Sequence, residues 1–158
     1  MSKPIIFDIE QKQIYMQEAL ALAYQAFLSQ EVPIGAVVVS NENIIGRGFN
    51  QTLSKGSVLA HAEILAIEDA CKNIGNHRLV DTILFSTIEP CHMCAKAIID
   101  ARISHIIFGA REPKSGSIVS VDSFLDRSFH NHSVSFEEEI LKDECKEIMQ
   151  RFFKARRN

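Results

Sequence analysis

The stretch Glu89-Pro90-Cys91-His92-Met93-Cys94 is the most informative part of this sequence. Pro90 suits the start of a helix, because its fixed φ and its missing N–H do no harm there. In a helix that begins here, Cys91 and Cys94 are three residues apart and lie on one face. A helix N-terminus also favours thiolates, the form of cysteine that binds a metal. By itself, the pair fits half of a structural zinc site, a redox pair or part of a catalytic site.

The composition around this stretch is that of a globular protein. The chain has 158 residues, of which 46% are hydrophobic, and its formal net charge is −3 at pH 7. This length predicts one domain over residues 1–158 that buries a core without disulfides. The slight negative charge argues against a protein that coats nucleic acid by bulk attraction. Without a secretory signal or an apolar run of the ~20 residues that span a bilayer, we expect a cytoplasmic protein with no membrane contact, whose thiols are free or metal-bound.

Hydrophobic periodicity predicts an alternation of helices and strands. Helices are expected over residues 9–29, 61–74, 91–102 and 137–156, with a short helix near 122–127. Strands are expected over residues 34–39, 44–49, 82–87, 105–108 and 133–136, the first two forming a hairpin. Strands joined by single helices lie parallel, with the helices covering the sheet. The pattern therefore predicts an α/β fold with its site at the carboxyl ends of the strands.

A second polar cluster, His61-Ala62-Glu63, stands at the start of the expected helix 61–74. If the two helices direct their N-termini at one point, His61, Cys91 and Cys94 come together. One imidazole and two thiolates suit zinc and leave its fourth tetrahedral position open for water. Glu63 is two residues from His61 and does not share its helix face. It can therefore take a proton from that water without binding the metal.

The other candidate residues have plainer interpretations. Cys71 and Cys145 are expected to pack in the core as small hydrophobic side chains. His92 is expected to point away from the face that carries the cysteine pair. The basic and aromatic residues 151–157 suit contacts with single-stranded nucleic acid, but an amphipathic terminal helix that packs its two Phe on the core explains them as well.

His61-x-Glu63 followed by Pro90-Cys91-x-x-Cys94 is the known signature of the zinc deaminases. Beyond this signature, the sequence resembles the bacterial tRNA-specific adenosine deaminases, the TadA family, over nearly its whole length. The resembling stretches are residues 31–38, 48–50, 61–64, 89–95, 108–111, 114–116, 131–132 and 152–157. The first few are common to many purine and pyrimidine deaminases, whereas the last four are more particular to the tRNA enzymes.

The resemblance implies a cytidine-deaminase-like fold, a three-layer α/β/α sandwich around a mixed five-stranded sheet, assembled as a homodimer. It implies one Zn²⁺ ion per chain, with His61, Cys91 and Cys94 as ligands and Glu63 as the proton shuttle. The implied reaction is zinc-hydroxide attack on C6 of the wobble adenosine (A34) of an arginine tRNA, which releases ammonia and leaves inosine.

The resemblance also implies how the RNA is held. Asn50 and the backbone N–H of Ala62 would bind the flipped base, whereas Lys114, Phe153 and Arg156 would contact the tRNA anticodon stem-loop. A base in a hairpin loop is already partly unstacked, so flipping it costs less than in a duplex.

Three residues depart from the family pattern and two alternatives remain open. Glu112 stands where Asp is common, Ser115 where Thr is common and Ser133 where Arg is frequent; these departures bear on RNA contacts rather than on the zinc chemistry.

A guanine or cytosine deaminase acting on a small substrate would carry the same central signature, although the basic tail argues against it. A binding module without turnover is the other alternative, and the intact Glu63 argues against that.

Overall fold

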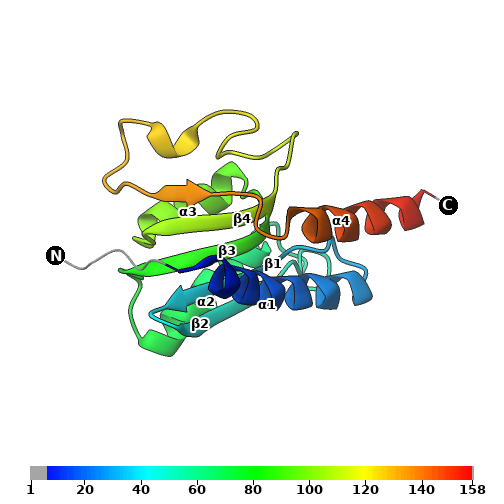
Figure 1. The fold of residues 1–158 in the computed structure, drawn as a ribbon, viewed down its shortest axis with the longest axis horizontal. Coiled ribbons are helices and arrows are strands. Elements are labelled where there is room, and N and C mark those ends of the chain that lie inside the picture. Colours follow the sequence, from blue (N-terminus) through cyan, green and yellow to red (C-terminus); the bar gives the residue numbers. More distant parts are fainter. Residues whose placement is uncertain (1–6, 158) are drawn as a thin grey trace.

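The computed structural model describes residues 7–157, along which helices and strands alternate as the sequence predicts (Figure 1). In chain order the elements are α1 (Ile9–Leu28), β1 (Gly35–Ser40), β2 (Asn43–Phe49), α2 (Ala62–Ile74), β3 (Thr82–Ile88), α3 (His92–Asp100), β4 (His105–Ala110), the 3₁₀ turn η1 (Phe124–Asp126), β5 (Ser135–Glu137) and α4 (Lys142–Arg156). Within this described part, no helix has both the length and the apolar composition needed to cross a membrane.

The largest differences from the predicted elements are at the last helix and near residues 122–127. The last helix was expected from residue 137, but α4 begins at Lys142. Residues 135–137 pair with β4 as a strand, and Glu139 and Leu141 then adopt φ angles of 76° and 52°, which no right-handed helix contains. The helix expected near 122–127 is only the single turn η1.

The five strands form one mixed sheet in the order β2-β1-β3-β4-β5. Strand β1 is antiparallel to both β2 and β3, whereas β3, β4 and β5 run parallel. Every residue of β3 is buried, as expected for the central strand. The helix α3 forms the crossover between the parallel neighbours β3 and β4, as the alternating pattern predicts.

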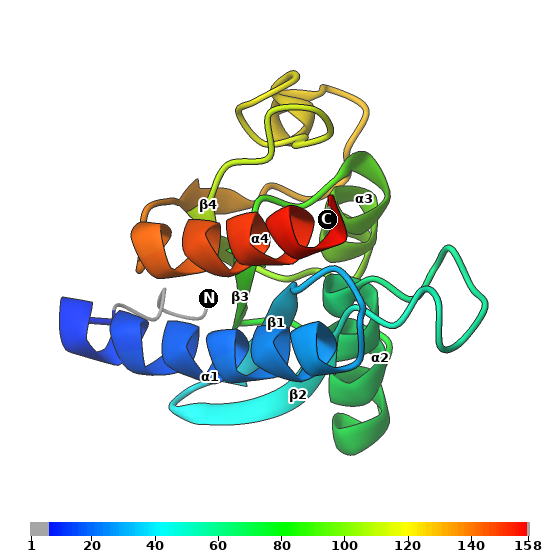
Figure 2. The same cartoon turned by 90° about the vertical axis from the view of Figure 1, so that its right-hand side faces the viewer.

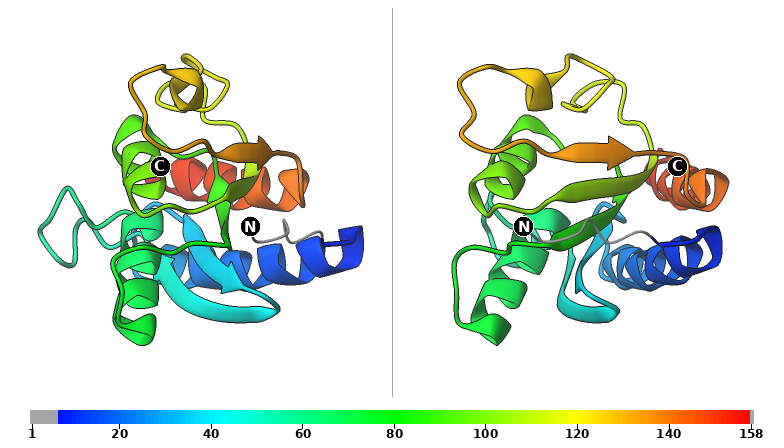
Figure 3. Two further views of the ribbon diagram at one scale, coloured as in Figure 1. Left: turned by 90° about the vertical axis from the view of Figure 1, so that its left-hand side faces the viewer. Right: turned by 60° about the vertical axis from the view of Figure 1, so that its left-hand side comes forward.

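The helices cover both faces of the sheet, so the predicted three-layer α/β/α arrangement is confirmed (Figure 3). On one face, α2 and α3 pack with residues such as Ala66 and Ile98 against Leu84 and Ile106. On the other face, α1 and α4 lie side by side (Figure 2), and their Phe27 and Phe152 rings are 6.2 Å apart.

Core packing also fixes the start of α2 against the sheet. A Cβ atom at Gly48 would lie 2.3 Å from the Ala62 carbonyl oxygen, so only glycine allows α2 to approach β2 this closely. Cys145, on the inner side of α4, is fully buried in the core that α1 and α4 cover, and Cys71 of α2 packs partly buried against the opposite core. Both cysteines therefore fill the packing roles that the sequence predicts.

Candidate active site

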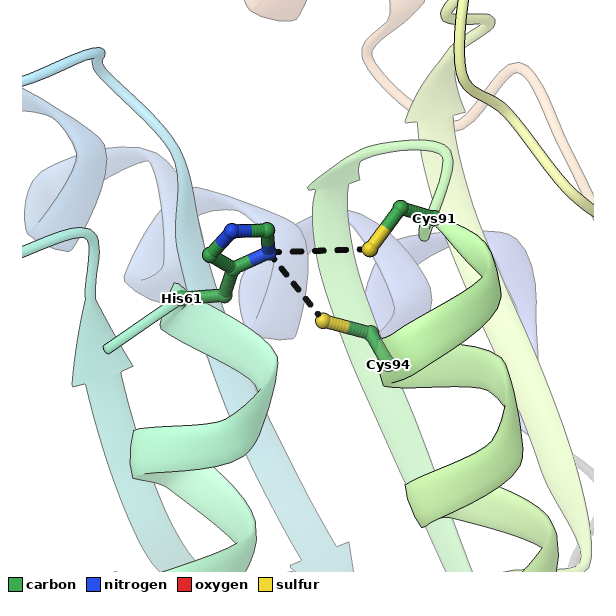
Figure 4. Close-up of side chains that lie close together, drawn as sticks. All are labelled: His61, Cys91 and Cys94. Atoms are coloured by element: carbon green, nitrogen blue, oxygen red, sulfur yellow. Dashed lines mark hydrogen bonds between the residues drawn. The ribbon is translucent and has the colours of Figure 1, made fainter. Parts of the chain in front are cut away.

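The first residues of α2 and α3 approach one another and bring three metal-binding side chains together (Figure 4). His61 is the N-cap of α2 and Cys91 is the N-cap of α3, both with extended backbones, while Cys94 lies in the first turn of α3. Neither residue uses its side chain to cap its helix. The imidazole faces the two thiols instead, in the convergence that the sequence predicts.

The spacing of these three side chains fits a tetrahedral zinc ion. His61 Nδ1 lies 3.6 Å from Cys91 Sγ and 3.4 Å from Cys94 Sγ. With Zn–N and Zn–S bonds of the usual lengths, adjacent corners of a tetrahedron would be about 3.5 Å apart for this nitrogen–sulfur pair. Among residues 7–157, no other three His, Cys, Asp or Glu side chains form such a group. Three ligands leave the fourth corner of the tetrahedron for water.

The electrostatics of the cluster favour one thiolate. Hydrogen bonding to the Cys94 thiol, and then to His61, lowers the pKa of Cys91 well below its usual range. Hydrogen bonding to Cys91, together with burial, raises the pKa of Cys94. The two sulfurs thus share one proton, which a divalent cation would displace. The hydrogen bond with Cys91 also raises the pKa of His61.

Glu63 lies beside this cluster without belonging to it. Its side chain, on the first turn of α2, is only 4% exposed and lines the same pocket as His61 and Cys91. Burial raises the pKa of Glu63 to about 7. A carboxyl whose pKa is near neutrality exchanges protons effectively at that pH. The position of Glu63 therefore suits a proton carrier.

The pocket at this site has a volume of about 290 Å³. Its lining includes Val32, Ile34, Asn50, Thr52, His61, Ala62, Glu63, Ile88, Glu89, Cys91, Glu112, Ser115, Met149 and Phe153. Asn50 is buried, and its side chain is held by a donated bond to the Val32 carbonyl at 3.3 Å and an accepted bond from the Thr52 N–H at 3.4 Å. Apolar walls with a few fixed polar groups are typical of a site for a flat organic ring.

The three expected RNA-contact residues occupy different places. Phe153, which is 43% exposed, lines the pocket from α4. Lys114 is exposed on the segment that follows β4 and does not line the pocket. Arg156 also lies outside it, because its guanidinium donates to the Gln30 carbonyl and stacks 4.4 Å over the Phe152 ring. Arg156 thus joins the end of α4 to the end of α1.

Two buried carboxylates have no role assigned from the sequence, Glu89 in the pocket lining and Glu31 next to the lining residue Val32. Glu31 accepts hydrogen bonds from the N–H groups of Leu53 and Ser54, and Glu89 accepts several from the segment after β4. Charged side chains are seldom buried without a specific partner. Both Glu31 and Glu89 fall in stretches that resemble the family, but no periodicity or spacing in the sequence indicates their partners.

His92 points away from the metal-binding cluster, as the helix geometry predicts. Its Nε2 lies 3.0 Å from a carboxylate oxygen of Asp122, and its ring packs edge-on against Phe124. Of the three residues that depart from the family pattern, Glu112 and Ser115 line the pocket, whereas Ser133 does not.

A buried carboxyl beside one imidazole and two thiols is the arrangement of the zinc deaminases. A family model places this protein in the deaminase class. The family model of the MafB19-like deaminases matches residues 10–157. The fold agrees with this class. A guanine deaminase from Nitrosomonas europaea, which is only 18% identical, has the same fold with a TM-score of 0.73, over 96% of each chain.

More similar relatives narrow the class. The tRNA-specific adenosine deaminase of Streptococcus pyogenes serotype M1 is 43% identical over 151 residues, which are 96% of this chain and 88% of the relative. That of Bacillus subtilis is 39% identical, over 93% of this chain and 91% of the relative. A structure from a study of A-to-I editing by tRNA:A34 deaminases superimposes with a TM-score of 0.83 at 39% identity, covering 85% of this chain and 98% of that one. The chain belongs to the family of tRNA-specific adenosine deaminases.

Proposed function

We propose that this enzyme converts the wobble adenosine (A34) of an arginine tRNA to inosine, with one Zn²⁺ ion held by His61, Cys91 and Cys94. The observation that carries the proposal is the 3.6 Å and 3.4 Å spacing of the His61 nitrogen from the two sulfurs, with Glu63 beside them. The names of the relatives, which specify tRNA and A34, support the substrate.

The residues of the chain divide the chemistry among them. When bound, zinc would supply an acidified water as the nucleophile. Glu63 takes a proton from this water and delivers it to N1 of adenine, which makes C6 electrophilic. After addition at C6, Glu63 takes the proton of the new hydroxyl group and delivers it to the amino group, which leaves as ammonia and gives inosine. The low exposure of Glu63 keeps bulk water from competing for that proton.

The pocket offers polar groups for the edge of the base. The amide of Asn50 is held in place by the backbone on both sides, so it can bind the base with little loss of side-chain freedom. Ala62 is the first residue of α2, where backbone N–H groups have no partner within the helix. We assign Asn50 and the Ala62 N–H to recognition of the flipped adenine, with Phe153 stacking near the pocket mouth.

The end of α4 is proposed to follow the RNA backbone. Lys114 and Arg156 are assigned to the same RNA surface; Arg156 would act there mainly by anchoring α4 through Gln30. Because Phe152 is buried against Phe27, deleting the helix end would damage the core as well as the RNA surface. Single substitutions of exposed side chains are therefore the better test.

Lys154→Ala is expected to weaken binding of an anticodon stem-loop and to lower the slope of log K against log salt concentration by about 0.7, because one phosphate contact is lost. Lys154 is exposed on α4, and Lys72→Ala, at the exposed end of α2, is the matched control. Fluorescence anisotropy at several salt concentrations measures both slopes. An unchanged slope in Lys154→Ala would give the end of α4 a purely structural role.

We also propose that residues 1–158 act as one deaminase domain, that it forms a homodimer and that it works in the cytoplasm, where tRNA is processed. The match of the family model over residues 10–157 supports the single domain.

The apolar side chains of Leu53, Val58 and Leu59 support the dimer. They are exposed on the segment between β2 and α2, which projects from the body and would be covered in a dimer (Figure 2). Light scattering is expected to give twice the chain mass; a monomer at micromolar concentration would contradict the dimer.

Product analysis tests the proposed reaction. Purified protein is incubated separately with an arginine tRNA anticodon stem-loop, with free guanine and with cytosine, and the products are separated by liquid chromatography and mass spectrometry. We expect inosine in the RNA and no xanthine or uracil. Xanthine or uracil with unchanged RNA would select the small-substrate alternative.

A further inference from the structure

Glu89 is a buried carboxylate at the junction between the sheet and the metal-binding helix. It directly follows β3 and is only 3% exposed. Its own N–H donates to the Ala110 carbonyl at 2.9 Å, which ties it to the end of β4. Burying a carboxylate is costly unless hydrogen bonds replace the lost water. The hydrogen-bond partners of the Glu89 carboxylate therefore indicate its role.

All the partners of the Glu89 carboxylate lie in the segment 112–120, which contains no regular helix or strand. Oε1 accepts the N–H of Glu112 at 3.1 Å and the hydroxyl of Ser120. Oε2 accepts the N–H groups of Ile118 at 3.0 Å, Val119 at 2.8 Å and Ser120 at 3.0 Å. Within residues 7–157, Glu89 forms no ion pair with a basic side chain. The Glu89 carboxylate thus occupies the place of a bound anion, and the backbone amides that converge on it fix the conformation of the segment.

The segment is shaped around this carboxylate. A Cβ atom at Gly116 would lie 2.3 Å from Glu89 Cδ, so glycine is needed for the segment to close over it. Next to Glu89, the Pro90 carbonyl accepts the N–H of Ser117 at 3.0 Å and the Ser117 hydroxyl at 2.9 Å. The segment is thus attached to the two residues immediately before Cys91.

The attached segment also forms part of the substrate pocket. Glu112 and Ser115 line it together with Asn50, which follows β2, and with Ala62 and Glu63 of α2. We propose that Glu89 is a positioning residue, which fixes the segment 112–120 and thereby holds this side of the pocket at a set distance from the metal-binding helix. The proposal deepens the proposed function, on which it rests for the identity of the substrate. Glu89 itself makes no contact with the reacting atoms in this assignment.

Glu89→Gln tests the proposal with a side chain of the same size. Each oxygen of the Glu89 carboxylate accepts at least two hydrogen bonds. In Glu89→Gln the NH₂ group replaces one of these oxygens and faces N–H donors, so those hydrogen bonds are lost and the segment loosens. We expect faster amide hydrogen exchange at Ile118, Val119 and Ser120. For the stem-loop we expect KM to rise about tenfold or more, while kcat stays within about threefold. The zinc content should be unchanged.

Thr82→Val is the matched control at the opposite end of β3. Thr82 is buried and its hydroxyl donates to the Leu79 carbonyl at 2.6 Å, so this variant also loses a buried hydrogen bond, far from the pocket. It is expected to lower thermal stability without changing KM or the exchange of residues 118–120. If Thr82→Val raises KM equally, the effect of Glu89→Gln is general destabilisation and the proposal is wrong.

Gly116→Ala tests the same contact from the other side, should Glu89→Gln fail to fold. Its added methyl group displaces the carboxylate, so it should reproduce the rise in KM and in exchange. The variant that combines Glu89→Gln with Gly116→Ala is expected to have the KM and the exchange rates of the more severe single variant, because both changes break the same contact. Unchanged exchange at residues 118–120 in either variant, or loss of zinc from Glu89→Gln, would overturn the proposal. Failure of the wild-type protein to deaminate the stem-loop would instead overturn the proposed substrate, while the exchange measurements still decide the role of Glu89.

Discussion

Glu63→Gln is expected to lower kcat by about 10³- to 10⁴-fold while the protein keeps its zinc. The amide has the shape of the carboxyl but cannot carry the proton between water and the base. Metal binding should persist because the ligand atoms of His61, Cys91 and Cys94 lie within 4.8 Å of one another without Glu63. Single-turnover kinetics on the stem-loop and metal analysis of the same sample measure both quantities.

Glu68→Gln is the matched control for this substitution, since Glu68 lies on the exposed side of the same helix, α2. It should leave both kcat and zinc content unchanged. If Glu63→Gln loses zinc, Glu63 is a metal ligand and the fourth coordination position is not open. If it turns over at the wild-type rate, another group carries the proton.

Cys94→Ser is expected to weaken zinc binding by more than about 100-fold, because even the loss of groups that only support a ligand costs 10- to 100-fold. Turnover at ordinary zinc concentrations should be lost with the metal. Zinc that binds only the folded protein also stabilises it. A chelator should therefore lower the melting temperature of the wild-type protein but not that of Cys94→Ser.

Cys145→Ser is the control for burial, since Cys94 and Cys145 are both fully buried. Cys145 lies on α4 and packs against β4, where its Sγ would lie 2.4 Å from a Cβ at Gly109. The change should lower stability through the buried hydroxyl but leave zinc content intact. Equal zinc in Cys94→Ser and the wild-type protein would remove Cys94 from the metal site.

The helix starts that carry the three side chains of the cluster could be predicted from the sequence, because helix-start signals are local. His61 and Cys91 each stand where a polar residue precedes an apolar helix, and Cys94 follows one helical turn later. Gly75, with a φ of 68°, ends α2 in the left-handed conformation that glycine favours at this position. Such signals lie within a few residues of the helix end that they specify. The approach of His61 to the two cysteines, 30 and 33 residues later, is not local, and its prediction rested on the deaminase signature.

The features that the sequence did not reveal depend on distant partners. Arg156 bonds to Gln30, 126 residues away, and nothing near either residue indicates the contact. Glu89 bonds to residues 23 to 31 positions later, in a segment without periodicity. The late start of α4 likewise reflects the pairing of β5 with β4, which overrides a sequence that favours helix from residue 137 onward.

The most direct test is anomalous diffraction at the zinc edge from crystals of the protein grown with zinc. We predict one zinc peak per chain, bound by His61 Nδ1, Cys91 Sγ and Cys94 Sγ, with a solvent molecule at the fourth position within reach of Glu63. A fourth side chain on the metal, or the absence of zinc from this cluster, would contradict the proposed mechanism.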